Sequence, residues 1–255
     1  MDSTQTKQHK LLLAVQLVCW LLPPSRFKNR LLTKFGHDIA LTARIAPTIT
    51  MGVNKFHVGE HVRIGLLNVF RGMSNVRLED YVIVDSFNWV SANPLYQDVD
   101  PQAGTLFMDI KSRVGSRNYL DCSGTIVVRA FGAVGGLRCV LQSHQPDLEH
   151  NRQSAGRITV GDHSWVASCA VMLKGSSLPD QSLLAANATM TPGSAREGKR
   201  GLYVGSPAKW KSETRGEFFD RLTYWIDETV VDEPMGITDG DRSESYKSRI
   251  IGAPE

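Results

Sequence analysis

Cysteine is scarce in this sequence and is not clustered. The 255 residues include four cysteines, and none of them belongs to a CxxC or CxxH pair: Cys19, Cys122, Cys139 and Cys169. A disulfide framework or a structural zinc site would need paired or closely spaced cysteines. We therefore expect reduced, mostly buried thiols, as is typical of a cytoplasmic protein.

A hydrophobic run long enough to cross a membrane is also missing. The apolar run at residues 11–22 has twelve residues, whereas a membrane-spanning helix needs roughly 20. No small-residue cleavage site follows this run, so we do not expect a secretory signal.

Two interpretations of the N-terminal segment remain open. In the first, the segment forms a helix that packs on its own domain or on a partner subunit, and so covers the end of the domain. In the second, residues 11–34 contact the inner face of a membrane. Four basic residues would then lie near the head groups: Arg26, Lys28, Arg30 and Lys34.

Neither sign of charge dominates the chain. The net charge is +3 with no long basic run, and the apolar fraction of 42% and charged fraction of 22% are typical of a soluble globular protein. The small basic excess is compatible with an anionic ligand such as a phosphate, but it gives no reason to expect nucleic acid as a partner.

A six-residue repeat is the most regular feature of the sequence. From Val160 the chain reads VGDHSW, VASCAV, MLKGSS, LPDQSL, LAANAT and then Met190. The first position is always aliphatic or Met, and the fifth is always Ser or Ala. Neither a helical period near 3.6 nor strand alternation produces this pattern. It predicts a triangular solenoid, in which each six supplies a short strand and a corner and three sixes complete a turn.

The same rhythm recurs upstream in weaker form. Two polar breaks, at residues 91–105 and 145–157, predict loops extruded from the coil. The expected inward residues are Ile39, Ile45, Met51, Val58, Ile64, Phe70, Leu78, Val84, Val90, Val114, Leu120, Val128, Val134 and Val140.

The ends of the chain differ from the repeat. We expect an N-terminal helical segment at 1–37, the solenoid domain at 38–211, and a C-terminal helix with a mobile tail at 212–255. The helix is expected over residues 213–231, where four apolar residues lie at helical spacing: Phe218, Leu222, Trp225 and Ile226.

Two quoted stretches resemble a known family. The segment ITVGDHSWVASCAVMLKGSSLPDQSLLAANATMTPG, followed by GLYVGSPAKWK, is similar to the C-terminal signature of hexapeptide-repeat acyltransferases, most of all those of the WbbJ and maltose O-acetyltransferase type. The resemblance implies a left-handed parallel β-helix and a homotrimer with active sites between neighbouring solenoids. It also implies a cytoplasmic O-acyltransferase that moves an acyl group, expected to be acetyl, from CoA to a hydroxyl of a sugar or glycolipid.

His144 is the candidate general base. In the family a histidine begins a loop shortly before the Gly-Asp coil, and His144 occupies this place before Gly161. Acyl transfer from a thioester to a hydroxyl requires removal of the hydroxyl proton. Imidazole, with an ordinary pKa near 6.5, can accept that proton and return it to the thiolate. Direct transfer then needs no covalent acyl-enzyme.

An imidazole base works better when an acceptor holds its other nitrogen. Asp121, a little more than one solenoid turn earlier, is the first candidate, and its position resembles that of a family aspartate. Asp147 and Glu149 are local alternatives. Asn118 is a candidate for binding the acceptor, although an asparagine at a solenoid corner would explain it equally well.

The resemblance also implies a donor site. In the family, coenzyme A lies along the C-terminal coils, where backbone groups of small residues contact the pantetheine arm and basic residues meet the phosphates. No metal is implied. The small residues that match are Ala167, Ser168, Ala186 and Thr191, and the basic residues are Lys209 and Lys211.

The sequence departs from the family pattern at two places, and other protein classes remain to be compared with it. The stretch VVRAFGAVGG replaces the usual opening of a coil, and Ser206 stands where the family usually has Asn. A γ-class carbonic anhydrase would need three zinc-binding histidines, and His57 with His61 lacks a convincing third. A longer acyl-CoA or acyl carrier protein as donor, and a non-enzymatic solenoid scaffold, remain the alternatives.

Overall fold

The fold was obtained as a computed structural model that describes residues 14–223, 230, 231, 236 and 241. The chain divides into one unit over residues 1–224 and a second over 225–255. Trp225, Ile226 and most of the predicted mobile tail lie outside the described residues. The description below therefore concerns the first unit.

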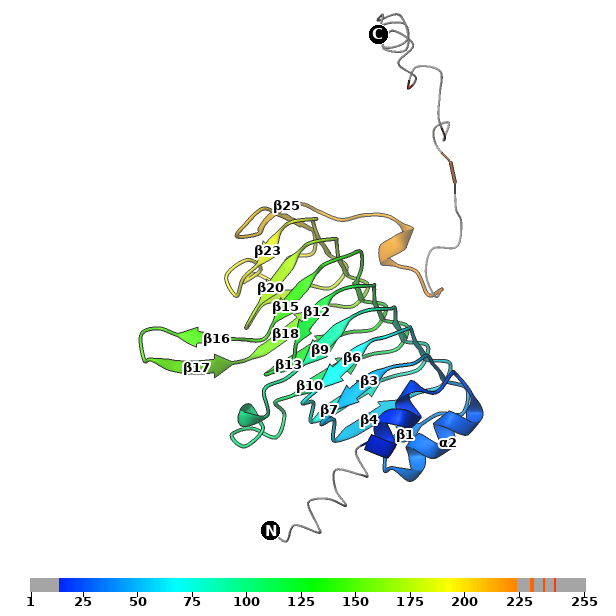
Figure 1. The fold of residues 1–255 in the computed structure, drawn as a ribbon. Coiled ribbons are helices and arrows are strands. Elements are labelled where there is room, and N and C mark those ends of the chain that lie inside the picture. The colour runs from blue at the N-terminus through cyan, green and yellow to red at the C-terminus, as the bar shows by residue number, and fades with distance from the viewer. Residues whose placement is uncertain (1–13, 224–229, 232–235, 237–240, 242–255) are drawn as a thin grey trace, which may run out of the picture. The chain divides into compact units, whose positions relative to one another are not determined.

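Three parallel sheets form the three faces of a coil (Figure 1). We call them faces A, B and C in the order in which the chain meets them. Face A holds β1 (Asp38–Ile39), β4 (Lys55–Val58), β7 (Asn75–Leu78), β10 (Thr105–Met108), β13 (Thr125–Val128), β18 (Arg157–Val160) and β21 (Ser177–Leu178).

Faces B and C continue each turn of the chain. Face B holds β2 (Arg44–Ile45), β5 (Arg63–Ile64), β8 (Ile83–Val84), β11 (Arg113–Val114), β14 (Ala133–Val134), β19 (Trp165–Val166), β22 (Leu183–Leu184), β24 (Leu202–Val204) and the antiparallel β25 (Lys209–Ser212). Face C holds β3 (Ile49–Met51), β6 (Val69–Arg71), β9 (Trp89–Ser91), β12 (Tyr119–Asp121), β15 (Val140–Gln142), β20 (Val171–Leu173) and β23 (Thr189–Met190).

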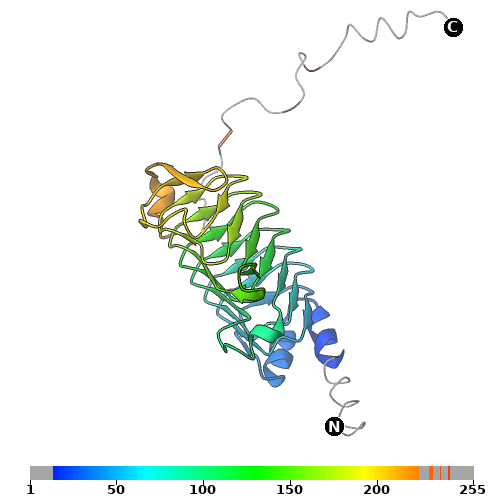
Figure 2. The same cartoon turned by 90° about the vertical axis from the view of Figure 1, so that its left-hand side faces the viewer.

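The chain forms a left-handed parallel β-helix, as the repeat and the resemblance predicted. Each strand pairs in parallel with its equivalent one turn later, so that Val160 faces Leu178 and Val166 faces Leu184. Figure 2 shows the turns stacked one on another along the coil axis. Because most pairings join neighbouring turns, each turn is stabilised mainly by the turns on either side of it.

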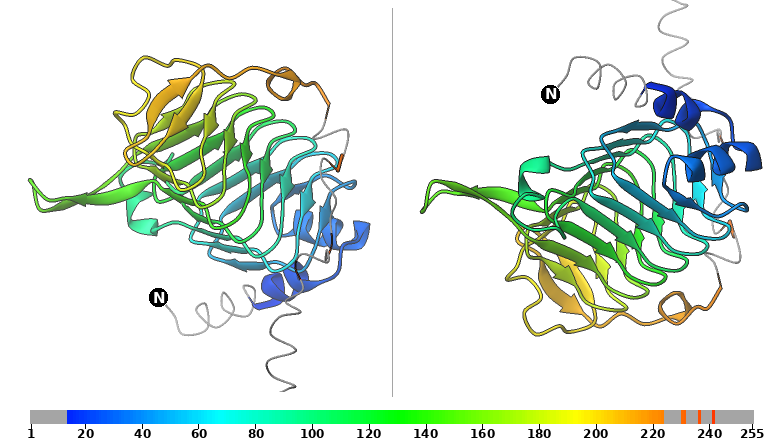
Figure 3. Two further views of the ribbon diagram at one scale, coloured as in Figure 1. Left: turned by 90° about the horizontal axis from the view of Figure 1, so that it is seen from above. Right: turned by 90° about the horizontal axis from the view of Figure 1, so that it is seen from below.

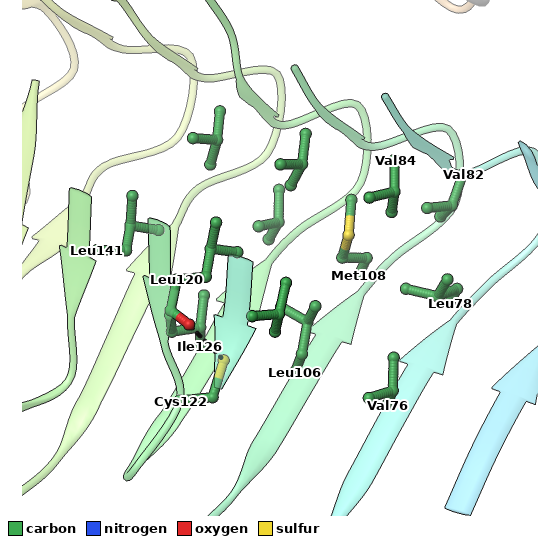
Figure 4. Packing of buried hydrophobic residues seen from close by; sticks show 14 of the residues in the cluster. Val76, Leu78, Val82, Val84, Leu106, Met108, Leu120, Cys122, Ile126 and Leu141 are labelled. Atoms are coloured by element: carbon green, nitrogen blue, oxygen red, sulfur yellow. Dashed lines mark hydrogen bonds between the residues drawn. The ribbon is translucent and has the colours of Figure 1, made fainter. Parts of the chain in front are cut away.

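The inward positions of the repeat are buried as expected. Every first-position residue from Val160 to Met190 is 0% exposed, and the small fifth-position residues are at most 1% exposed. The aliphatic side chains fill the interior in rows that run from turn to turn (Figure 4). The small residues fit at corners where the chain bends tightly against its neighbours.

Met51 is a correction to the predicted pattern. It is 42% exposed, because the inward residue of this turn is Thr50, which pairs with Phe70 in the next turn. The corner between Ile45 and Thr50 is one residue shorter than the corner between Ile64 and Phe70. A one-residue change in corner length moves every following side chain to the opposite face of its strand.

Val140 is a second correction, and it arises from the opposite change. Leu141 is the buried residue of this turn, and it pairs with Leu120 before it and Met172 after it. The corner after Val134 is one residue longer than the usual six-residue spacing. The turn that contains VVRAFGAVGG, which replaces the usual opening of a coil, thus differs by a single added residue, and β13 and β14 keep their parallel partners.

Two helical segments close the first turn of the coil. The first is described from residue 14 to residue 21, and the second is α2 (Arg26–Lys34). Trp20 is fully buried, and its ring lies 4.4 Å from that of Phe56 in the coil. The N-terminal segment thus packs on its own domain and covers the end of the coil, as in the first of the two interpretations. Within residues 14–223, the structure contains no helix long and apolar enough to cross a membrane.

Lys28 ties the helical cap to the coil. The side chain is fully buried. The three N–H donors of its ammonium are shared among four carbonyl oxygens, those of Trp20 (2.6 Å), Leu22 (2.8 Å), Ile45 (2.9 Å) and Ala46 (3.1 Å). The placement of Lys28 near membrane head groups is therefore wrong. A buried ammonium is tolerated here because all of its donors are satisfied.

The predicted C-terminal α-helix is wrong over its described part, residues 213–223. A short 3-10 helix, η2 (Glu217–Phe219), is the only helical element there. The carbonyl of Phe219 accepts from Gln181 Nε2 at 2.8 Å, and that of Leu222 accepts from Lys111 Nζ at 2.9 Å. Side chains of the coil thus take carbonyls that a helix would bond to its next turn.

Candidate active site

His144 and Asp121 meet at the corner between faces C and A. Asp121 ends β12 and pairs in register with Gln142, so His144 begins just past the end of the neighbouring strand. His144 Nδ1 contacts Asp121 Oδ2, and the backbone N–H of His144 donates to the same oxygen at 3.2 Å. The stacking of turns therefore brings together two residues that are 23 positions apart.

Asp121 is a buried carboxylate with its acceptor positions filled. It is 2% exposed, and its Oδ1 accepts from the backbone N–H of Ser123 at 3.1 Å and from the Ser123 hydroxyl at 2.6 Å. With the two contacts from His144, four donors face its two oxygens, which offer about four lone-pair positions. Since the carboxylate only accepts, His144 Nδ1 carries a proton and Nε2 is left to accept another.

His144 also begins an arm that the sequence did not predict. Residues 145–157 were expected to be a loop, but β16 (His144–Asp147) pairs antiparallel with β17 (Arg152–Ala155). The resulting hairpin projects from the coil in both views of Figure 3. The side chain of His144 is 33% exposed at the base of this arm, so a substrate can reach it.

The local alternatives to Asp121 point elsewhere. Asp147 accepts from Arg152 Nε at 2.8 Å and pairs with His150, and the hydrogen bond from Arg152 is the main cause that lowers the pKa of Asp147. Glu149 is exposed on the arm. The structure thus brings Asp121, and neither of these two carboxylates, against His144.

Tight packing at the arm base requires glycine. A Cβ atom on Gly124 would lie 2.0 Å from the carbonyl oxygen of Gly156, far inside van der Waals contact. The backbone N–H of Gly124 donates to Ser143 Oγ at 2.8 Å, and Gly156 N–H donates to the Ser143 carbonyl at 2.8 Å. These contacts hold the two ends of the arm and the preceding turn together beside His144.

A second excursion, residues 92–104, lies beside the arm base. It contains the 3-10 helix η1 (Pro94–Tyr96), drawn next to the root of the arm in Figures 1 and 3. The ring of Tyr96 lies 5.9 Å from that of His144. Burial raises the pKa of Tyr96, and the negative charge of Asp121 raises it further.

A cavity of about 680 Å³ opens between these two excursions. Its size is in the range of small-molecule sites. One wall comes from residues 93–103 and the other from residues 153–157, with Gly124 and Thr125 between them. Its polar lining includes Asp100, Gln102, Gln153 and Arg157. A molecule held here would lie beside Tyr96, whose ring contacts His144.

Cys122 directly follows Asp121, and its thiol is a possible nucleophile near the candidate site. It is fully buried, and burial raises its pKa well above the ordinary value, with the charge of Asp121 as a further cause. A thiol in this state is a poor nucleophile. The geometry therefore gives no support to an acyl-cysteine intermediate at Cys122.

Asn118 belongs to a ladder inside the coil. It is 2% exposed, its backbone N–H donates to Asn88 Oδ1 at 2.8 Å, and its own Oδ1 accepts from the N–H of Cys139 at 2.8 Å. Asn68 Oδ1 binds Asn88 in the same way at 2.9 Å. The solenoid-corner explanation of Asn118 thus fits the structure, and the acceptor-binding one does not.

The expected donor-site residues fall into two groups. Ala167, Ser168 and Ala186 lie at the corner between faces B and C in successive turns, and Thr191 lies after β23 at the corner that also carries His144. Because Ala167, Ser168 and Ala186 occupy the same corner in neighbouring turns, they can line one continuous strip along the coil.

Lys209 and Lys211 are both exposed on β25. The pairing is irregular at Lys211, because Tyr203 pairs with Trp210 and Leu202 with Ser212. Lys209 pairs with Val204, at the end of β24 that leads to the corner between faces B and C. Both lysines thus lie at the edge of face B.

His57 and His61, the two histidines considered as zinc ligands, contact different partners. His57 contacts Asp38 at 3.2 Å, and His61 stacks on Tyr81 with ring centroids 5.0 Å apart. Within the part of the chain that the structure describes, no three His, Cys, Asp or Glu side chains are grouped as metal ligands would be.

Comparison with known proteins finds similar folds but no related sequence. No protein-family model matches this chain, and no curated protein matches it. A serine-to-alanine variant of AntD, an N-acyltransferase from Bacillus cereus in complex with dTDP-4-amino-4,6-dideoxyglucose and coenzyme A, is similar with 12% sequence identity and a TM-score of 0.48. It covers 75% of this chain and 91% of that chain.

Two further solved structures are similar at the same low level. The polySia specific acetyltransferase NeuO has 14% identity and a TM-score of 0.40, and covers 84% of this chain and 92% of that one. The polysialic acid O-acetyltransferase OatWY has 14% identity and a TM-score of 0.38, and covers 78% of this chain and 90% of that one. At these values the likeness carries no argument about activity.

Proposed function

We propose that this protein is a cytoplasmic O-acyltransferase that moves an acyl group, in the first place acetyl, from CoA to a hydroxyl of a sugar or glycolipid. The observation that carries the proposal is the pair formed by His144 and the buried Asp121. The imidazole of this pair lies beside Tyr96, which lines a cavity large enough for a saccharide. A histidine oriented by a carboxylate is the arrangement that general-base catalysis of acyl transfer needs.

In the proposed reaction, His144 Nε2 removes the proton of the acceptor hydroxyl as its oxygen bonds to the thioester carbonyl carbon. The carbon–sulfur bond then breaks, and the proton passes from His144 to the leaving thiolate. Asp121 keeps the imidazole in the tautomer that can accept at Nε2, and it stabilises the imidazolium while the proton is held. The products are the acyl ester and free CoA.

The cavity supports a saccharide acceptor with an apolar attachment. Its amide and charged groups, those of Gln102, Gln153 and Arg157, are suited to sugar hydroxyls, and Arg157 is suited to an anionic substituent. Leu95 and Val99 line the same cavity and are 70% and 85% exposed. These side chains could contact the lipid part of a glycolipid, which would lie against the same wall.

For the donor, we propose that CoA lies along the corner that carries Ala167, Ser168 and Ala186. The small side chains leave the backbone accessible to the pantetheine arm, and the exposed ammonium groups of Lys209 and Lys211 are suited to the phosphates. Thr191, at the corner of His144, would contact the donor nearer to the thioester.

An apolar row on face C supports the proposed homotrimer. Its members follow one another in register on the outer side of six successive strands, and Trp89 and Tyr119 are 43% and 42% exposed. Asp121 lies on the same side of β12 as Tyr119, so the row passes the candidate site at β12. The residues of this row are Ile49, Val69, Trp89, Tyr119, Val140 and Val171.

The test is release of CoA from acetyl-CoA in the presence of sugars and lipid-linked sugars. We expect acceptor-dependent release that is lost in His144→Ala. Release only from a longer acyl-CoA or from acyl carrier protein would replace the donor assignment. No release from any of these donors, by a folded protein, would favour the scaffold alternative.

A further inference from the structure

Tyr96 lies between the candidate base and the cavity. Its ring contacts the imidazole of His144 with centroids 5.9 Å apart and planes inclined by 52°. The same residue lines the cavity, together with Leu95 and Val99 of its own loop. Any acceptor whose hydroxyl reaches His144 from the cavity must therefore pass alongside Tyr96.

The loop that carries Tyr96 is attached to the Asp121–His144 pair. The Ser123 hydroxyl donates to Asp121 Oδ1 at 2.6 Å and accepts from the backbone N–H of Asn93 at 3.1 Å. Asn93 is the N-cap of η1, and its Oδ1 accepts from the backbone N–H of Leu95 at 3.1 Å. Ser123 thus links the carboxylate to the turn that presents Tyr96.

The hydroxyl of Tyr96 is buried and has no hydrogen-bond partner among the described residues. Such a group costs free energy unless a partner is supplied. Asp121 is the charged group whose field reaches it, but four donors from His144 and Ser123 already fill the acceptor positions of this carboxylate. A phenylalanine would pack here equally well and would avoid the cost.

We propose that Tyr96 contacts the acceptor, and that its hydroxyl donates a hydrogen bond to an acceptor oxygen bound next to His144. A rotation of the Tyr96 side chain, which stands on an exposed surface loop, turns the hydroxyl from the protein interior to the cavity. The bond would fix the sugar with one hydroxyl at His144 Nε2. This inference rests on the proposed acyltransferase function and deepens it by naming a residue that selects the acceptor.

The test uses Tyr96→Phe with Tyr81→Phe as the matched control, since Tyr81 stands on a distant corner and stacks on His61. Acceptors are maltose, N-acetylglucosamine and N-acetylneuraminic acid, with acetyl-CoA as donor. For Tyr96→Phe we expect kcat/KM for the acceptor to fall roughly 10-fold, the scale of one hydrogen bond, with KM for acetyl-CoA within about twofold of wild type. The thermal midpoint should stay equal or rise, because no bond of the fold is lost.

Monodeoxy derivatives of the best acceptor identify the oxygen that Tyr96 binds. One deoxy position should lower kcat/KM roughly 10-fold for the wild type and have no further effect in Tyr96→Phe, because the same bond is removed from either side. Equal losses in both proteins at every position would overturn the inference, as would an unchanged acceptor kcat/KM in Tyr96→Phe. If Tyr96→Phe is normal while His144→Ala is inactive, only the inference about Tyr96 fails. If wild type turns over no acceptor, the proposed function fails with it.

Discussion

Asp121 and His144 touch because one turn of the coil is stacked on the next. Asp121 pairs in register with Gln142, and His144 follows two positions later, where the chain leaves the coil to form the arm. The carboxylate is 2% exposed while the imidazole is 33% exposed. One partner is thus held by the core, and the other is partly exposed beside Tyr96, a residue that lines the cavity.

Asp121→Asn should lower kcat about 10²-fold or more and leave KM for acetyl-CoA nearly unchanged. An amide cannot serve all four donors that now face Asp121, and its N–H₂ group can donate to His144 Nδ1, which would place the imidazole proton on Nε2. Steady-state kinetics measure the effect. Asp147→Asn, on the arm, is the matched control and should behave as wild type. A raised KM for acetyl-CoA with normal kcat in Asp121→Asn would instead indicate a donor-site role.

Lys209→Ala and Lys211→Ala should raise KM for acetyl-CoA, and the increase should shrink as salt rises. Both ammonium groups are exposed, and attraction between exposed charges is screened over about 8–10 Å at 0.1–0.15 M salt. Acetyl-pantetheine has no nucleotide phosphates, so its KM should hardly change. Lys34→Ala, on the helical cap, serves as control. Equal losses with both donors would rule out phosphate recognition by these lysines.

If the protein is the proposed homotrimer, Trp89→Glu should convert it to monomers, as measured by light scattering coupled to size-exclusion chromatography. A carboxylate in the middle of the apolar row on face C would have to be buried without a partner in the assembly. Ile110→Glu is the control, because Ile110 has a similar exposure, 39%, but lies at the corner between faces A and B, away from face C. A monomeric wild type, or a Trp89→Glu variant that remains trimeric, would contradict this role of face C.

The free energy of unfolding should fall as the pH is lowered from about 6.5 to 4, in part because of His37. Burial lowers the pKa of His37 to about 4, and the positive charge of Lys55 contributes. The unfolded chain, with an ordinary pKa near 6.5, binds the proton more tightly, so protonation favours unfolding across this interval and costs up to about 3 kcal/mol at its lower end.

The contribution of His37 is isolated by comparison of variants. His37→Gln should lose less stability than wild type between pH 6.5 and pH 4, as measured by chemical denaturation. His61→Gln, an exposed histidine on the first turns, should follow the wild-type curve. Parallel curves for His37→Gln and wild type would show that His37 does not titrate in the folded cap.

The six-residue repeat predicted the coil because its signal is physical and local. One large inward residue and one small corner residue per strand are required by the triangular cross-section, so Val160 through Met190 could be assigned by spacing alone. Met51 and Val140 were misplaced because their corners differ in length by one residue. Corner length depends on loop conformation, which the periodicity does not encode.

The position of Asp121 relative to His144 was predictable from turn length, but Tyr96 was not. Its loop is an excursion from the repeat, and only the bond between Ser123 and Asn93 reveals that this excursion folds back on the carboxylate. The arm was missed because HQPD and RQSA show little strand preference. Their pairing is long-range, and ion pairs such as Arg152 with Asp147 support it.

The C-terminal helix was predicted from apolar residues at helical spacing, but the described part of this segment packs on the coil. Phe219 is buried, and Phe218 packs on Trp165 with rings 5.3 Å apart, while Leu222 is 75% exposed. Contacts with the coil override the helical spacing. The role of Asn118, in contrast, could have been predicted from the sequence. Asn68 and Asn88 occupy the equivalent position in the two preceding turns, and an alignment of the turns would have shown the three asparagines as one buried ladder.

The most direct test of the central claim is the rate of acceptor-dependent CoA release by His144→Ala, with His150→Ala on the same arm as control. If His144 is the general base, kcat should fall by roughly 10² or more, while the thermal midpoint stays near that of wild type because the imidazole is partly exposed. His150→Ala should turn over normally. A His144→Ala protein with wild-type kinetics would contradict the account, because no other group described here could then be the base held by Asp121.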